Sequence, residues 1–355
     1  MISFKRHRIN GPGSRHSYLL LVALILVWSG GRGLKAQDIH FSQFYAAPLL
    51  TNPASTGMSG EGLRVANIYR NQWAMIGIPY ETLTTSVDRK ITIAGRSFGI
   101  GGAVIHDQSS SFHLSANEFM ISLSYSRIFR NQQLTFGVQP GYVFKSFNLG
   151  GMTFGSQFNS VSEFFDATLP TLEDGLTDRL DYFDLNAGLF WRTMIRRLMP
   201  SAGFSVSHLN MPLQKFSTSS TGTRLNMKLN VNGGVMVPVS DRIALSPSLI
   251  YSYTPGTNEF LLGSMVDYSL SKSISSVQKV YAVAMFRMNP VRNVDALILG
   301  GGADFLNFNL GLVYDLNISP LASTANFNGA FEVSLIYKGK GHIRNNKNQP
   351  CYIIN

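Results

Sequence analysis

The 355-residue sequence has a formal net charge of +10 and is 45% hydrophobic and 12% aromatic, but only 14% charged. An average soluble domain carries about 25% charged residues, and no run of 18 or more apolar residues follows the N-terminal region, which argues against a helical membrane protein. The many Gly (33), Phe (24) and Tyr (14) residues instead favour strands and turns.

The first 36 residues have the pattern of a secretory signal peptide. A basic region without acidic residues precedes the apolar run 18–28 (YLLLVALILVW), and Ala36 supplies the small residue expected before a cleavage site. A retained signal anchor is the alternative, but the apolar run is short for a membrane span. No Cys lies near the cut, so a lipoprotein is not expected.

The basic composition does not indicate nucleic-acid binding. Cleavage after Ala36 removes six basic groups and lowers the formal net charge from +10 to +4, and four more basic residues lie near the C-terminus, at positions 338, 340, 344 and 347. The intervening body is therefore nearly neutral. The single Cys351 cannot form an intramolecular disulfide.

The body of the chain reads as a series of strands with alternating apolar and polar residues. Between 119 and 126, for example, Phe, Ile, Leu and Tyr alternate with Met and Ser. Fourteen candidate strands are predicted, at 61–70, 80–89, 97–106, 117–128, 133–146, 181–192, 200–208, 224–238, 242–253, 258–270, 279–288, 294–303, 306–317 and 326–338. Alternation over ten or more residues is longer than a usual globular strand and matches a transmembrane strand.

These strands predict an all-β fold: a transmembrane antiparallel β-barrel of about 14 strands over residues 61–338. A soluble β-sandwich or jelly roll is the alternative, but it would have shorter strands and more Lys and Glu on its polar face. Closure also satisfies the backbone groups that an open sheet edge would leave unpaired in lipid. Pro140 and Pro247 fall inside predicted strands and are expected to disturb the local register.

The lengths of the connections suggest an orientation. Short turns are predicted at one end, and the long connections 147–180 and 209–223 at the other, as in barrels with short periplasmic turns and long external loops. We therefore expect residues 37–60 to form a periplasmic N-terminal segment and residues 339–355 a basic periplasmic tail. The 147–180 loop is a candidate cap or lumen plug.

Residue patterns that suggest chemistry are weak. The acidic residues Glu173, Asp174, Asp178, Asp181 and Asp184 lack the spacing of an EF-hand and are expected to form a solvated loop. His106 and Asp107 are adjacent, so on a strand they face opposite sides and do not make a hydrolase site with the nearby serines. The glycines at 99–102 are not followed by a helix signal, as a phosphate-binding loop requires. No catalytic residue, metal or cofactor is predicted.

Motifs at the two ends of the body carry a family resemblance. Residues 37–45 (QDIHFSQFY) are followed by 52–54 (NPA) and 69–73 (YRNQW), and the C-terminal part contains 314–317 (YDLN) and 329–337 (GAFEVSLIY). Together these resemble the PorP/SprF family of the type IX secretion system. One departure is that Pro350-Cys351 is followed by Tyr352, where many members have a second proline.

The resemblance implies a non-enzymatic outer-membrane barrel of Bacteroidota, needed for type IX secretion or for surface delivery of gliding adhesins. It implies contacts with outer-membrane lipid, with periplasmic ring lipoproteins or a peptidoglycan-binding partner, or with a large secreted adhesin, and none with nucleic acid. The family-motif residues, which are also our candidates for partner contacts, are Phe41, Gln43, Asn52, Pro53, Arg70, Asn71, Gln72, Trp73, Asp315, Asn317 and Glu332.

Two functions from different classes remain open: a component of the secretion machinery, or a diffusion channel or solute transporter. The predicted inward positions are mostly Ser, Gly, Asn and aromatic, which favours a narrow or plugged lumen. The aromatic residues Phe41, Phe44, Tyr45 and Trp73 are expected to plug the periplasmic mouth or to lie in the interface belt. Arg64 and Arg70 share a strand face and, with Asp88, predict an ion pair in the lumen that either holds the barrel or binds a ligand.

Overall fold

The computed structural model describes residues 39–60, 62–74, 79–109, 114–148, 154–159, 163–166, 168–171, 175–217, 221–270, 277–289, 293–319 and 328–339. The predicted signal peptide and nearly all of the predicted basic tail lie outside these residues. Within them, fourteen long strands form a closed barrel: β1 (Arg64–Gln72), β2 (Tyr80–Ile93), β3 (Arg96–Ser109), β4 (Leu114–Phe129), β5 (Gln132–Ser146), β8 (Arg179–Thr193), β9 (Met199–Ser207), β12 (Lys228–Pro238), β13 (Ile243–Thr254), β14 (Thr257–Ser269), β15 (Val277–Asn289), β16 (Asn293–Phe305), β17 (Phe308–Asn317) and β18 (Asn328–Lys338).

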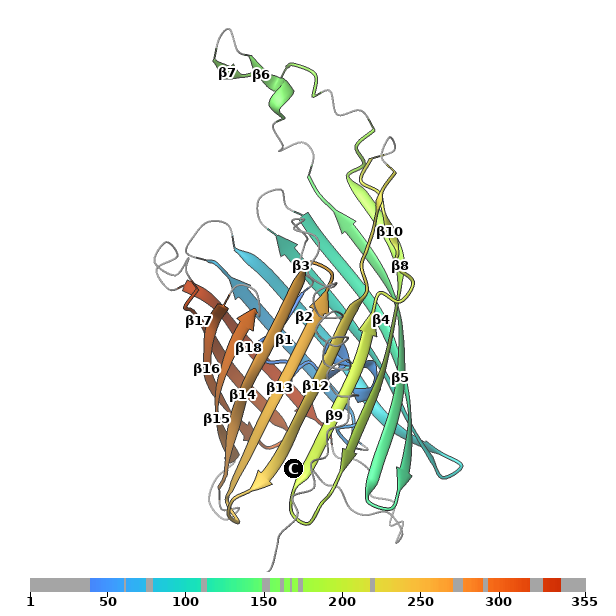
Figure 1. Ribbon diagram of the computed structural model, residues 1–355, viewed down its shortest axis with the longest axis vertical. Helices are drawn as coiled ribbons and strands as arrows, with labels where there is room; N and C mark the ends of the chain where they lie inside the picture. Colours follow the sequence, from blue (N-terminus) through green and yellow to red (C-terminus); the bar gives the residue numbers. More distant parts are fainter. Residues whose placement is uncertain are drawn as a thin grey trace, which may run out of the picture. The chain divides into compact units, whose positions relative to one another are not determined.

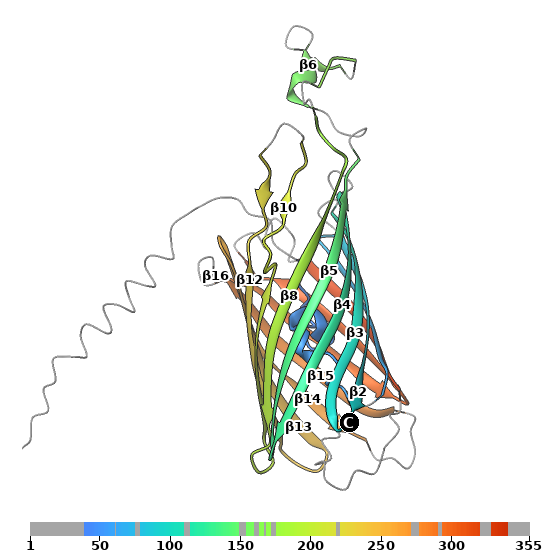
Figure 2. The same ribbon diagram turned by 90° about the vertical axis from the view of Figure 1, so that its right-hand side faces the viewer.

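The strands follow one another around the barrel in chain order, and every neighbouring pair is antiparallel (Figures 1 and 2). The last strand, β18, pairs with the first, β1, from Arg64 opposite Lys338 to Gln72 opposite Ala330. This pairing closes the sheet and leaves it without an edge. Each of the fourteen predicted strands corresponds to one of these strands, so the predicted fold is confirmed.

The alternation of the sequence separates an outer from an inner face. On β4, Phe119 and Ile121 are 47% and 61% exposed on the outside, whereas Ser122 and Ser124 are buried on the inside. On β5 the outward residues from Leu134 to Phe144 are predominantly apolar. Such a band over eleven residues of a tilted strand matches the lipid-facing band of a transmembrane barrel. None of the helices in the described ranges is long and apolar enough to cross a membrane.

Most short connections lie at one end of the barrel and the two longest at the other. The first end carries the turns at 94–95, 130–131, 194–198, 239–242 and 306–307, with the connection 270–276; the other carries the connections 147–178 and 208–227, with the two-residue turn 255–256. In the described parts of those two connections lie the short strand pairs β6 (Phe158–Asn159) with β7 (Phe164–Phe165), and β10 (Leu213–Gln214) with β11 (Thr223–Arg224). These four short strands were not predicted.

Both prolines predicted to disturb the register interrupt one neighbouring ladder. The β4–β5 pairing runs to Met120 opposite Gly141 and resumes at Leu123 opposite Val138, which omits Pro140. The β12–β13 pairing likewise omits Pro247, although Pro247 stays opposite Ser264 on β14. Proline lacks the N–H that the ladder needs, so each strand accommodates it by leaving one side locally unpaired.

A plugged lumen as the candidate functional site

The chain before β1 lies inside the barrel. Residues 39–60, named the plug here, include the short helix α2 (Pro48–Thr51) and the 3₁₀ turn η1 (Pro53–Ser55). Figure 2 shows these turns within the wall of strands. The sequence suggested a periplasmic segment over 37–60, whereas the described part, 39–60, occupies the lumen. The Asn52 side chain caps η1, since its Oδ1 accepts a hydrogen bond from the Ala54 N–H at 2.9 Å.

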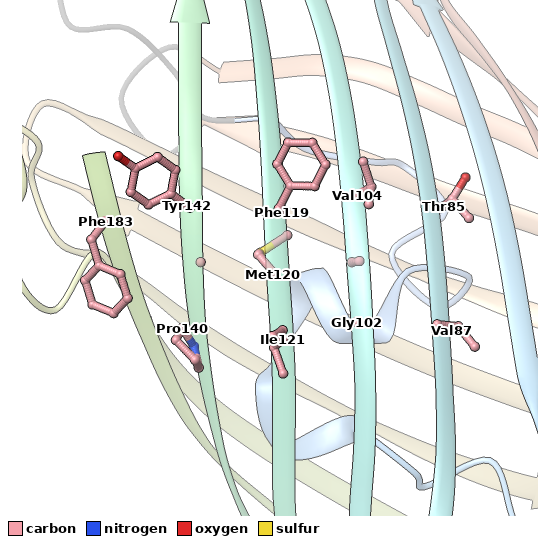
Figure 3. A pocket seen from close by; sticks show the side chains of 12 residues that line it. Thr85, Val87, Gly102, Val104, Phe119, Met120, Ile121, Pro140, Tyr142 and Phe183 are labelled. Atoms are coloured by element: carbon pink, nitrogen blue, oxygen red, sulfur yellow. The ribbon is translucent and has the colours of Figure 1, made fainter. Parts of the chain in front are cut away.

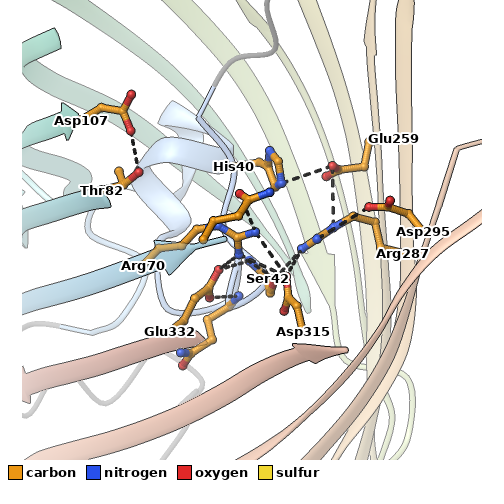
Figure 4. A network of polar contacts seen from close by, with 12 residues as sticks. His40, Ser42, Arg70, Thr82, Asp107, Glu259, Arg287, Asp295, Asp315 and Glu332 are labelled. Atoms are coloured by element: carbon orange, nitrogen blue, oxygen red, sulfur yellow. Dashed lines mark hydrogen bonds and ion pairs between the residues drawn. The ribbon is translucent and has the colours of Figure 1, made fainter. Parts of the chain in front are cut away.

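A buried polar cluster, named the latch, holds the start of the plug (Figure 4). It consists of Ser42, Arg70, Arg287, Asp315 and Glu332, all of them buried. The Glu332 carboxylate accepts hydrogen bonds from the backbone N–H groups of Ser42 and Gln43, at 2.6 and 2.8 Å. It also pairs with Arg70, which stands directly opposite it across the β1–β18 junction.

The other half of the latch neutralises the remaining charges. Asp315 lies 2.8 Å from the Arg287 guanidinium and 3.2 Å from that of Arg70, and it accepts a hydrogen bond from the Ser42 hydroxyl at 2.8 Å. Two arginines and two carboxylates therefore balance one another. Buried charges are tolerated only when they are paired and hydrogen-bonded, and here the plug backbone supplies part of that bonding.

The middle of the plug presses against the barrel wall where the wall has no side chains. A Cβ atom built on Gly137 of β5 would lie 2.3 Å from the backbone N of Ala54, and one built on Gly188 of β8 would lie 2.0 Å from Asn52 Oδ1. Both distances are far below van der Waals contact. The Asn52 amide also donates to the backbone carbonyls of Leu189 and Phe204, at 3.0 and 3.3 Å. The plug and the wall thus fit each other at this point.

The end of the plug is fixed near the start of β1. The Gly57 N–H donates to Asp88 Oδ2 at 2.7 Å, and the other oxygen of Asp88 accepts from Arg64 Nε at 2.7 Å. Both side chains of this ion pair are buried. The predicted Arg64–Asp88 pair in the lumen is therefore confirmed. Arg70, which we had grouped with it, has Asp315 and Glu332 as partners instead.

Apolar packing completes the seating of the plug. Phe41, Ala46 and Ala47 form a buried cluster with wall residues of β1 and β18, and Phe44 and Tyr45 pack on a second cluster along β13 to β17. We expected these aromatic residues at the periplasmic mouth or in the interface belt. They instead lie within the barrel, because the latch that holds the adjacent backbone is in the half nearer the longer connections.

Little space remains beside the plug in the region where its first residues meet the wall. A cavity lined by residues including Ile39, His40, Lys228 and Glu259 has a volume of about 50 Å³. That is room for a few water molecules only. His40 Nε2 approaches Glu259 Oε2 to 3.7 Å across this space.

The other motif residues lie close to the strand ends. Asn71 is buried and donates to Glu81 Oε1 at 3.1 Å, while Gln72 accepts from Arg70 at 3.3 Å. Trp73 is exposed and packs edge-on against Tyr80, with ring centroids 5.3 Å apart. Asn317 accepts from the Ser319 N–H at 3.0 Å. The role of the motif residues as partner contacts stays a prediction.

The residues considered above for a hydrolase or metal site do not come together in the structure. Asp107 is bonded to Thr82 at 2.6 Å, whereas His106 faces outward and contacts Asn117 at 2.8 Å. In the described part of the chain no group of three or more His, Cys, Asp or Glu side chains is arranged to hold a metal ion. Of the five acidic residues expected to form a solvated loop, Asp181 and Asp184 lie on β8 instead: Asp184 faces inward beside His208, and Asp181 faces outward beside Tyr142. Glu173 and Asp174 lie outside the described residues.

A second cavity lies on the outside of the barrel. It has a volume of about 550 Å³ and crosses β2, β3, β4, β5 and β8 on their outer face (Figure 3). Val104, Phe119 and Ile121 line it and are exposed. This groove therefore opens towards lipid and is separate from the plugged lumen.

The sequence pointed to Asp315 and Glu332 only as family-motif residues and to Arg70 also as a residue of a lumen ion pair, and it missed Arg287, Gly137 and Gly188. Arg287 lies in an alternating strand and belongs to no motif. A basic residue on the inner face of a strand nevertheless indicates an ion pair in the lumen. Gly137 and Gly188 occupy inner-face positions of long strands, where a missing side chain suggests that another part of the chain approaches closely.

Comparison with known proteins gives one family match. The family described as "Type IX secretion system membrane protein PorP/SprF" matches residues 33–337. No curated protein matches the chain.

Several solved structures resemble this chain in fold. The toluene transporter TbuX of Ralstonia pickettii is 11% identical with a TM-score of 0.48, over 84% of this chain and 94% of that one. CdiB of Acinetobacter baumannii is 7% identical with a TM-score of 0.45, over 78% and 60%. A FadL homologue of Pseudomonas aeruginosa is 11% identical with a TM-score of 0.43, over 81% and 92%. At these TM-scores the likenesses carry no argument about function.

Proposed function

The chain belongs to the family of type IX secretion system membrane proteins PorP/SprF, and from this membership and its plugged lumen we propose that it is a non-conducting, non-enzymatic component of the secretion machinery. A closed barrel with an apolar outer band is how strands cross the outer membrane, and the protein is an outer-membrane protein. Membership implies interaction with the secretion machinery. The proposal adds that it supports secretion, or surface delivery of gliding adhesins, through contacts with periplasmic components or a secreted substrate.

The seated plug is the observation that carries this proposal. A diffusion channel needs a continuous polar path through its lumen, and such barrels have water-filled interiors. Here residues 39–60 occupy the interior and are hydrogen-bonded to β1, β2, β4, β8, β17 and β18. A barrel held closed in this way can anchor partners at both membrane surfaces without making the membrane leaky.

Two measurements on the full chain test the proposal. In planar lipid bilayers the wild-type barrel is expected to show no stepwise conductance, and a strain lacking the gene is expected to lose type IX secretion. Gly137→Ala with Gly188→Ala displaces the plug and is expected to produce conductance steps, because both added methyl groups collide with it. Gly233→Ala is the matched control, since its Cβ would lie 3.5 Å from the nearest atom.

Wild-type conductance of the kind porins show would favour the alternative, an outer-membrane diffusion channel or solute transporter. Normal secretion in the strain without the gene would contradict the role in secretion itself. The two outcomes are independent, because the first concerns the lumen and the second concerns the machinery.

A further inference from the structure

The end of the barrel with the short turns carries exposed basic residues. In the described part of the chain, Lys338 at the end of β18 is one of them, and seven more are arginines of the short hairpins, named the basic rim here: Arg89, Arg96, Arg127, Arg130, Arg196, Arg197 and Arg242. The rim arginines come from the β2–β3, β4–β5, β8–β9 and β12–β13 hairpins. The near-neutral charge of the body as a whole therefore hides a concentration of positive charge at one end.

Acidic residues do not neutralise this rim. Among the described residues of this end, Asp241 is the exposed acidic one. Asp88 is buried with Arg64, and Asp267 and Asp304 are bonded to Lys279 at 3.1 and 3.3 Å. The rim therefore presents an uncompensated positive surface to whatever lies beyond the short turns.

The same turns expose large apolar side chains. Ile93, Phe129, Ile195, Leu198 and Val239 are 42% to 64% exposed, each within four residues of a rim arginine. Arg127 lies over the Phe129 ring, 5.3 Å from its centroid. Arginine combined with aromatic and aliphatic anchors is the composition of protein–protein contact sites.

The rim arginines lie on four hairpins between β2 and β13. Lys338, whose N–H bonds to the Asn307 carbonyl at 2.7 Å, adds an exposed basic residue beside the β16–β17 turn. Each rim arginine thus stands next to exposed apolar side chains, an arrangement that fits an acidic protein surface with apolar contacts.

We propose that the basic rim is a docking surface for an acidic face of a periplasmic protein of the secretion machinery. This inference rests on the proposed function, and on the rule that short turns of outer-membrane barrels face the periplasm. Arginine pairs with carboxylates through two parallel hydrogen bonds, and the uniform sign of the rim would guide an acidic partner to it. The chain also leaves the barrel at this end, where the Gly339 N–H bonds to the Leu63 carbonyl at 2.7 Å, and the sequence beyond contains basic residues and no acidic one.

Charge reversal of rim arginines tests the docking surface in the full-length protein, expressed in the organism that produces it. Arg130→Glu, Arg196→Glu and Arg197→Glu together are expected to reduce type IX secretion at least tenfold, whereas lysine at the same three positions preserves it. The matched control reverses three exposed basic residues at the opposite end: Arg179→Glu, Lys215→Glu and Arg224→Glu. Heat-modifiable migration on gels verifies that each barrel folds, and single reversals replace the triple variant if it does not.

A photoreactive amino acid identifies what touches the rim. Placed at Ile195, it is expected to form an adduct with a protein of the machinery, and the triple reversal is expected to remove that adduct. Placed at Leu213, an exposed position at the opposite end of the barrel, it is expected to form no adduct that the triple reversal removes.

Adducts with lipid alone at Ile195, or protein adducts insensitive to charge reversal, would overturn the proposal. So would full secretion by the triple variant in a background where loss of the gene abolishes secretion. That last result leaves the proposed function intact, whereas normal secretion and normal adhesin delivery without the gene would refute the function and not only the docking surface.

Discussion

Glu332 joins three parts of the molecule through one carboxylate. It accepts the Ser42 and Gln43 N–H groups of the plug, and it pairs with Arg70 across the β1–β18 junction. Its burial is tolerated because each of its oxygens has donors. The seating of the plug and the closure of the barrel therefore depend on the same side chain.

Glu332→Gln is expected to lower the free energy of unfolding by about 3 kcal/mol, because breaking a buried ion pair leaves an uncompensated charge. The amide would retain one acceptor but turn N–H donors towards a site that already contains backbone donors. Denaturant titration of the folded protein in micelles, followed by tryptophan fluorescence, measures the change.

Asp181→Asn serves as the control for this variant, because Asp181 is exposed on the outer face beside Tyr142. Its effect is expected to stay within about 0.5 kcal/mol. Equal losses of stability in the two variants would show that Glu332 contributes no more to the free energy of unfolding than an exposed carboxylate does.

The two ion pairs differ in how far the sequence predicts them. Arg64 and Asp88 stand on consecutive strands, so strand alternation alone brings them to the same inner face, and the pairing of hairpin neighbours predicts their contact. Arg70 and Glu332 are separated by nearly the whole chain. Their contact depends on the register between the first and last strands, which no local pattern determines.

At the scale of elements, period-2 alternation predicted the strands because each strand has lipid on one side and polar groups on the other. The plug has no such period. Its residues turn every few positions through α2 and η1, and it is defined by what it contacts: the latch, Gly137 and Gly188. Long-range packing of this kind produces no periodic pattern in the sequence. The family motifs were therefore the main sequence signal for the plug.

The β2–β3 hairpin offers a test of an element by itself. Its two-residue turn places Ala94 at φ 50° and Gly95 at φ 74°, the geometry of a type I′ turn, in which asparagine is preferred at the first position. Ala94→Asn is expected to raise the free energy of unfolding by roughly 0.5–1 kcal/mol, because alanine is strained in the left-handed region.

Ala94→Val is the opposite control, since a β-branched side chain is least tolerated at positive φ. Denaturant midpoints of the three proteins should fall in the order Asn, Ala, Val. Any other order would mean that the turn does not limit the stability of this hairpin.

On the scale of the whole molecule, the family motifs near the two chain ends form one site. The first and last strands are neighbours because the barrel closes, so Arg70 of the N-terminal motif meets Asp315 and Glu332 of the C-terminal motifs. The plug connects to both ends of this seam. It follows that in the wild-type protein the plug and the barrel should open as a single cooperative unit.

Hydrogen exchange tests that cooperativity. The Ser42, Gln43 and Gly57 amides lie outside any strand, but each donates to a buried carboxylate at 2.6 to 2.8 Å. Their exchange is therefore expected to require the same global opening as the amides of β1 and β18. Peptides covering 39–60 should exchange as slowly as those strands and much more slowly than peptides containing the largely exposed residues 163–166 and 168–171. If the plug peptides exchange at the rate of those exposed peptides while the strands stay protected, the plug opens independently, and the lumen can be unblocked without unfolding the barrel.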